Sequence, residues 1–217
     1  MSRSTWFRRR ITVDKTEPVE TNQQPTHRRT IVIESYETDE TFAIQAVLKD
    51  ERPWADGASD VRDVHEMHLD VTVDKATLTI TDAHAEMTNF PHEECRSIEP
   101  AFRALVGLSV MRGYTRNVQE RLGRERGCSH MEFLARAIGP AVIQSMASSS
   151  SRRGTTVVSG PEVLNQGSWL RNTCHLWAEG GIGSAKIAEG WRPGMDGYPA
   201  ASLVELRRRD KANEDLA

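Results

Sequence analysis

The sequence predicts an α+β fold: a small antiparallel sheet of about four strands covered by three helices, with an irregular, glycine-rich C-terminal region. Three observations predict it. Apolar residues alternate with polar ones in the first half of the chain, apolar residues recur at helical spacing between residues 97 and 146, and six glycines lie from Gly180 to Gly197. Strands followed by helices are typical of this class, whereas α/β proteins alternate the two.

Four strands are expected in two hairpins. Residues 30–35 and 41–48 are rich in β-branched and aromatic residues and flank a short polar connection. Residues 64–73 alternate between apolar and polar side chains with a period of two, and residues 77–81 alternate again after a short turn. Each hairpin has one apolar face, so other elements have to cover the sheet on that side.

Two short helices are expected next. The first begins near Ser97, a good N-cap residue, and ends at Gly107. The second begins at Thr115 and is closed by Gly123.

A longer third helix is expected from Ser129, which forms a capping-box pattern with Glu132. Its Gly139-Pro140 pair should kink or shorten it. A serine-rich linker is expected at residues 148–154. The apolar residues that would form the buried face of this helix are Phe133, Leu134, Ala137, Ile138, Ala141, Val142 and Met146.

The chain is expected to form one domain with a tail at each end. Its 217 residues favour a single domain, placed at residues 28–200. Residues 1–27 are interpreted as a disordered leader, because residues 16–27 are polar, contain two prolines and lack periodicity. Residues 201–217 are interpreted as a charged C-terminal tail.

Composition excludes several classes of partner. The net charge of −3 and the pI of about 6.2 give no global basic field, so no nucleic acid is expected. An RNA-binding accessory role would depend on arginine triplets at residues 8–10 and 207–209, which lie in the expected tails. No apolar run is long enough to cross a membrane, and no secretory signal is expected, because no apolar segment follows the basic residues at positions 8–10. Three cysteines rule out a disulfide framework, so a cytoplasmic location is expected.

All three cysteines lie near histidines, which suggests a metal site. Cys128 and His130 are two positions apart, and Cys174 and His175 are neighbours. Zinc takes thiolate and imidazole ligands, so Cys128, His130 and Cys174 are candidate ligands if zinc is the metal. No Cys-x-x-Cys finger pattern accompanies them, and the alternative is that the cysteines are small buried hydrophobes. Which of Cys174 and His175 faces the centre stays open.

Catalysis by the same residues is the other interpretation. Cys128 would lie just before a helix N-terminus, where the helix dipole favours a thiolate, with His130 or His175 as its base. His65 shares a strand face with apolar residues, so it is either a satisfied core residue or an acid–base group in a pocket. Arg116 could bind an anionic group, as could Arg126.

Motifs of the common enzyme classes are missing. The sequence contains no Walker loop, GxGxxG, HExxH or GxSxG pattern. Their absence weighs against nucleotide hydrolysis, dinucleotide redox chemistry, zincin chemistry and α/β-hydrolase chemistry.

Several short stretches together resemble a known family. They are residues 64–67 (VHEM), Phe90-Pro91 leading to Cys95, residues 105–108 (LVGL), 113–116 (GYTR), 126–130 (RGCSH) and 172–175 (NTCH). They are similar to the bacterial family catalogued as domain of unknown function 2889, over roughly residues 28–191. The chain departs from that family in the serine-rich insertion after Met146 and in its longer polar leader.

The resemblance implies a small bacterial cytoplasmic α+β protein associated with the breakdown of steroid and aromatic compounds. It also implies that the three cysteines and His65, His130 and His175 belong to the family's own motifs. A family by itself supplies no reaction.

The leading hypothesis is a catabolic enzyme, a lyase or hydrolase without an organic cofactor, acting on a hydrophobic aromatic or polycyclic intermediate. His65 or His130 would be the general base, Arg116 or Arg126 would steady an anionic group, and Cys128 would shape or activate the site. The alternative hypothesis is a non-catalytic binding or accessory module with a structural zinc held by cysteine and histidine. Homo-oligomerisation is left open by both.

Overall fold

The computed structural model describes residues 24–111, 113–152, 172, 174–183 and 185. The strands are β1 (Arg28–Glu37), β2 (Thr41–Glu51), β3 (Asp63–Asp74) and β4 (Ile80–Asn89). They form one antiparallel sheet in the order β1-β2-β3-β4. Three helices follow, η2 (Glu93–Leu105), α1 (Tyr114–Leu122) and α2 (Ser129–Arg152), with short 3₁₀ turns η3 (Arg124–Arg126) and η4 (His175–Trp177). The predicted α+β fold is confirmed.

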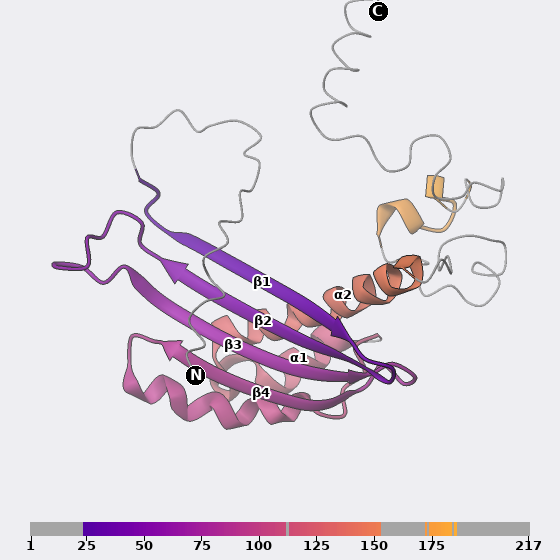
Figure 1. Cartoon of the computed structure of the whole chain (residues 1–217), viewed down its shortest axis with the longest axis horizontal. Coiled ribbons are helices and arrows are strands. Elements are labelled where there is room, and N and C mark those ends of the chain that lie inside the picture. The colour runs from indigo at the N-terminus through magenta and orange to yellow at the C-terminus, as the bar shows by residue number, and fades with distance from the viewer. Residues whose placement is uncertain (1–23, 112, 153–171, 173, 184, 186–217) are drawn as a thin grey trace, which may run out of the picture.

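One face of the sheet carries the core, and the helices lie on that side. Figure 1 shows α1 and α2 behind the four strands, with η2 alongside β4. On β2, the side chains of alternate residues from Phe42 to Asp50 are buried, as the period of two requires. The core joins apolar side chains of all these elements, including Leu48, Leu69, Phe102 and Leu134.

The fourth strand lies later in the chain than the sequence predicts. It was expected at residues 77–81, but β4 runs from Ile80 to Asn89. Leu78 has a positive φ of 54°, which fits a turn before the strand. The buried positions of β4 include Ala83 and Ala85, whose small side chains give only a faint alternating pattern.

Helix α2 differs from its prediction in which residues it buries and where it ends. Its buried apolar residues are Met131, Leu134, Ala135, Ile138 and Val142, whereas Phe133 is 41% exposed. The helix continues through Pro140 and through most of the serine-rich segment that was expected to be a linker. Ser149 in that segment is buried.

Gly139 has a packing role in α2. A Cβ atom at this position would lie 2.6 Å from Cδ1 of Tyr114, so a larger residue would force α1 and α2 apart. The Tyr114 hydroxyl donates a hydrogen bond to the Ala135 carbonyl at 2.9 Å, which fixes the two helices against each other. Helix α2 also contacts β1, β2 and β3, which places it over the sheet.

Some predictions fall outside the described residues. They concern most of the leader, residues 153–171, the glycines from Gly190 to Gly197, and the C-terminal tail. Within the part of the chain that the structure describes, no helix has the length and apolar character needed to cross a membrane.

Candidate active site

A row of polar side chains crosses the covered face of the sheet at one end. Arg29 on β1 is the Cα partner of Asp50 on β2, and Asp50 is in turn the partner of His65 on β3. Partners in antiparallel strands project to the same side, so the three side chains meet. Asp50 continues the buried series of β2, and its side chain is only 2% exposed.

The sheet is irregular on both sides of β3 near His65. The register between β2 and β3 shifts just after Asp50, and the register between β3 and β4 shifts between Glu66 and Met67. Such irregularities change the local direction of a strand and are common next to active sites. Here the register shifts lie where polar side chains take the place of apolar ones on the covered face of the sheet.

Asp50 is the centre of this group. Its carboxylate accepts two hydrogen bonds from Arg29, from Nε to Oδ1 and from Nη2 to Oδ2, both at 2.7 Å. The His27 Nε2 atom lies 3.2 Å from Oδ1, and the His65 Nδ1 atom lies 3.1 Å from Oδ2. The His130 Nε2 atom lies 3.7 Å from Oδ2. We call these five residues the Asp50 cluster.

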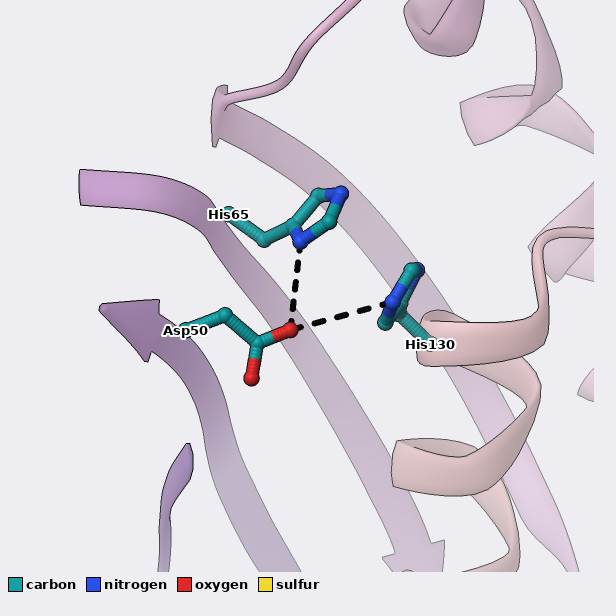
Figure 2. A group of neighbouring side chains, drawn as sticks. All are labelled: Asp50, His65 and His130. Carbon is teal, nitrogen blue, oxygen red and sulfur yellow. Dashed lines mark hydrogen bonds and ion pairs between the residues drawn. The ribbon is translucent and has the colours of Figure 1, made fainter. Parts of the chain in front are cut away.

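The two inner histidines come from different elements. Figure 2 shows His65 reaching Asp50 from β3 and His130 reaching it from the first turn of α2. Their ring centroids lie 4.1 Å apart, and the two ring planes are tilted by 34°. On the other side of its ring, the His130 Nδ1 atom lies 3.8 Å from Sγ of Cys128. The His130 ring therefore lies between a carboxylate and a thiol.

The charge state of Asp50 is set by opposing effects. Burial of its carboxyl raises the pKa, but the hydrogen bonds and charge of Arg29, the charge of His27 and the hydrogen bond of His65 lower it more. The pKa of Asp50 is therefore below its ordinary value, and the group is an anion at neutral pH. The same contacts raise the pKa of Arg29.

His130 is held in its neutral form. Burial is the largest effect that lowers the pKa of its imidazole, and the charges of His65, Arg29 and His27 lower it further against the opposing charge of Asp50. A histidine with a pKa below its ordinary value is unprotonated at neutral pH. Such a histidine can accept a proton.

The segment before β1 contributes to the site. The Trp54 indole Nε1 donates a hydrogen bond to the Thr26 carbonyl at 2.9 Å, one residue before His27. This bond holds the main chain where His27 can contact Asp50. His27 had been assigned to the leader, with no role.

The structure brings together some of the residues proposed from the sequence. His65, His130 and Cys128 lie at the Asp50 cluster. Arg116 lies on α1, is 77% exposed, and pairs with Glu120 on the same helix. His175 lies in η4, and Cys174 caps that turn with an exposed side chain. Arg126, also proposed for an anion, pairs with its neighbour Glu125.

Metal binding has one geometric argument for it and one against it. Among the described residues, ligand atoms of Asp50, His65 and His130 lie within 4.8 Å of one another, a spacing that a metal ion could bridge. The proposed set of Cys128, His130 and Cys174 does not form such a group in the described part of the chain. However, a carboxylate has about four lone-pair positions, and hydrogen bonds from Arg29 and His65 already occupy three of them on Asp50, with His27 3.2 Å away. A metal would have to displace one of them.

Sequence reasoning missed Asp50, Arg29 and His27. The signal for Asp50 was present, because the alternation of residues 42, 44, 46 and 48 continues to position 50 and places a carboxylate on the core face. The predicted strand ended at Leu48 and so stopped one step short. Arg29 and His27 depend on register and on the Trp54 contact, which no local pattern shows.

Comparison with known proteins gives one match. The family profile described as "Protein of unknown function (DUF2889)" matches residues 27–144, which include all of the Asp50 cluster and Cys128. Neither the curated proteins nor the solved structures contain a significant match.

Proposed function

The chain belongs to the DUF2889 family, and we propose that it is a small-molecule enzyme, a hydrolase or a lyase, that transfers protons at the Asp50 cluster. One observation carries the proposal. Two imidazoles from separate elements face the same buried carboxylate oxygen, at 3.1 Å for His65 and 3.7 Å for His130. A carboxylate that orients an imidazole is the usual arrangement of a histidine that acts as a general base.

The contacts assign a role to each ring nitrogen. The Nδ1 atom of His65 faces a carboxylate, so it carries the proton and leaves Nε2 as the acceptor. The Nε2 atom of His130 faces the same carboxylate, so Nδ1 is its acceptor. The cluster thus offers two proton-accepting nitrogens next to an anion that stabilises the protonated imidazole.

Arg29 takes the role that the sequence had suggested for Arg116 or Arg126. It binds Asp50 through two hydrogen bonds and keeps the carboxylate charged despite its burial. Its side chain is 34% exposed, so its remaining N–H groups are accessible to an anionic substrate group. Arg29 therefore both sets the charge of the site and can steady a substrate.

Aromatic side chains near the cluster support a hydrophobic substrate. Trp54 is 48% exposed and holds the main chain beside His27. Phe133 is 41% exposed and lies one turn after His130 on α2, with Arg136 over its ring. Exposed aromatic rings next to a polar centre are typical of sites for aromatic or polycyclic molecules.

Matched histidine variants test the proposal. The full chain would be assayed with 4-nitrophenyl esters and benzoyl thioesters for hydrolysis, and with β-hydroxy aryl ketones for lyase chemistry. His65→Ala and His130→Ala should each lower turnover by about 10²–10⁴-fold, the usual contribution of a general base. His68→Ala is the control, because His68 lies on β3 but pairs with Glu66 on the opposite face of the sheet. Full turnover in both site variants would contradict the proposal.

The alternative is a non-catalytic module with a structural zinc. The spacing of Asp50, His65 and His130 is its support, and the occupied lone pairs of Asp50 are the argument against it. Elemental analysis of tag-free protein distinguishes the two. One zinc per chain together with a fall in melting temperature after chelation would favour the module, because metal binding is coupled to folding.

A further inference from the structure

We propose that Cys128 is the nucleophile of a Cys128–His130–Asp50 triad, so that the enzyme cleaves an ester or thioester through an acyl group bound to Cys128. This inference deepens the proposed function and rests on it for the proton transfer by His130. It assigns hydrolysis rather than lyase chemistry, and it names an acyl compound as the substrate class.

The order of contacts carries the inference. Cys128 Sγ lies 3.8 Å from His130 Nδ1, and His130 Nε2 lies 3.7 Å from Asp50 Oδ2. A thiol on one ring nitrogen and a carboxylate on the other is the arrangement that activates a cysteine nucleophile, and such contacts are often long before a substrate binds. Because Nε2 faces the carboxylate, Nδ1 is free to take the thiol proton.

The position of Cys128 suits a nucleophile. It directly precedes α2, and its carbonyl accepts the first bond of that helix from the Glu132 amide at 2.7 Å. Amides in the first turn of a helix point out of its N-terminal end and lack acceptors within the helix. Because Cys128 directly precedes these residues, their amides could bind the oxyanion formed on a substrate carbonyl. Cys128 is only partly buried, so a small acyl compound can reach it.

The chemical steps balance with water as the only co-reactant. His130 Nδ1 takes the proton of the Cys128 thiol as sulfur bonds to the carbonyl carbon. The bond from that carbon to the oxygen or sulfur of the leaving group then breaks, and the leaving group takes the proton from His130. Water next attacks the acyl carbon, and His130 accepts its proton. The carbon–sulfur bond then breaks to release the acid, and His130 returns the proton to the sulfur to restore the thiol.

The other cysteines give an internal comparison for the first test. Full-length protein would be treated with iodoacetamide, and labelling of each cysteine would be followed by peptide mass spectrometry. Cys174 is exposed, whereas Cys128 is partly buried, so access alone would make Cys128 the slower of the two. Activation by His130 should instead make Cys128 react about 10-fold faster than Cys174 at neutral pH.

Variants link that reactivity to the triad. His130→Ala and the more conservative His130→Gln should slow labelling of Cys128 and leave Cys174 unchanged. His84→Ala is the matched control, because His84 lies on β4 with an exposed side chain, and it should change neither rate. Labelling of Cys128 that is slower than that of Cys174 and indifferent to His130 would overturn the inference.

A second test looks for the acyl group itself. With 4-nitrophenyl acetate, the protein should release nitrophenolate in an initial burst and carry one acetyl group on Cys128, and Cys128→Ala should abolish both. If Cys128→Ala keeps its turnover while His65→Ala and His130→Ala lose theirs, the triad is wrong and the proposed function stands. If all three variants keep full turnover, both are wrong. Absence of any acetyl group on Cys128 also counts against the triad.

Discussion

The two ends of α2 each cover a carboxylate on the sheet, and the two carboxylates differ in their partners. At the start of the helix lies the Asp50 cluster. At its end, Glu37 accepts hydrogen bonds from Lys75 and Ser149 at 2.6 Å and from Arg152 at 2.7 Å. We call these four residues the Glu37 cluster.

Both clusters attach α2 to the sheet, but they differ in the chemistry of the groups around the carboxylate. The partners of Glu37 are a lysine, an arginine and a serine. Three histidines contact Asp50, and imidazole is the side chain whose ordinary pKa lies closest to neutrality. The Glu37 cluster therefore has the composition of a structural clamp, and the Asp50 cluster has that of a reactive site.

The groove on the surface lies at the Glu37 end of α2, not at the Asp50 cluster. A groove of about 610 Å³ lies beside Glu37, lined by Ile33, Ser35, Tyr36, Phe42, Ala141, Gln144, Ser145, Ser148, Ser149 and Arg152. No histidine or cysteine is among the described residues that line it. This groove lies away from the imidazoles and the thiol, so side-chain chemistry is the better guide to the site here.

Replacing Asp50 should lower the free energy of unfolding more than replacing Glu37. Asp50 is 2% exposed and 11% of the Glu37 side chain is exposed. Asp50→Ala should lower the free energy of unfolding by about 3 kcal/mol, because it leaves the partly buried guanidinium of Arg29 without its anionic partner. Glu37→Ala should cost about 1–2 kcal/mol, because Arg152 is largely exposed to water and Lys75 keeps its hydrogen bond to the Thr38 carbonyl. Urea unfolding measures both, and an equal loss in the two variants would contradict the distinction.

The sequence was sufficient for the fold because local patterns determine it. Runs of β-branched and aromatic residues predicted β1 and β2, and period-two alternation predicted β3. Helical spacing with Gly123 and Ser129 predicted α1 and α2. Where small residues weaken the pattern, as in β4, the predicted position was wrong.

The candidate site was harder to predict, because it depends on register and packing. His65, His130 and Cys128 could be named from residue type and their position before a helix. Asp50 required a strand to be extended past its last apolar residue, and Arg29 required the pairing of β1 with β2. Arg116 was a plausible anion binder by residue type, yet it pairs with Glu120 on α1.

Lowering the pH should lower the free energy of unfolding through His130 and Asp50. The pKa of His130 is lowered in the folded protein by burial and by nearby positive charges, so the unfolded chain binds its proton more readily. Its contribution to stability is therefore fully present above the ordinary value of 6.5 and is lost as pH falls below it. Asp50 adds a further loss below its ordinary value of 3.8, because its folded pKa is lowered as well.

Urea unfolding between pH 8 and pH 5 tests the His130 part of this effect. The wild-type protein should lose stability over that range, and His130→Gln should lose less. His84→Gln should keep the wild-type dependence, because His84 is exposed on β4 and is not part of the Asp50 cluster. A His130→Gln variant with the wild-type pH dependence would show that His130 is not held neutral in the folded protein.

The smallest expected effect concerns His27, which joins the Asp50 cluster from outside the sheet. Burial, His65 and Arg29 lower the pKa of His130 more than the charge of His27 does, and His27 itself is 53% exposed. His27→Gln should therefore raise the pKa of His130 slightly, as measured by NMR titration of its ring protons, while His84→Gln should not change it. An unchanged pKa in His27→Gln would mean that the hydrogen bond from Trp54 to Thr26 does not hold His27 at Asp50 in solution. The Asp50 cluster in solution would then consist of strand and helix residues alone, whereas the Glu37 cluster includes Lys75 from a turn.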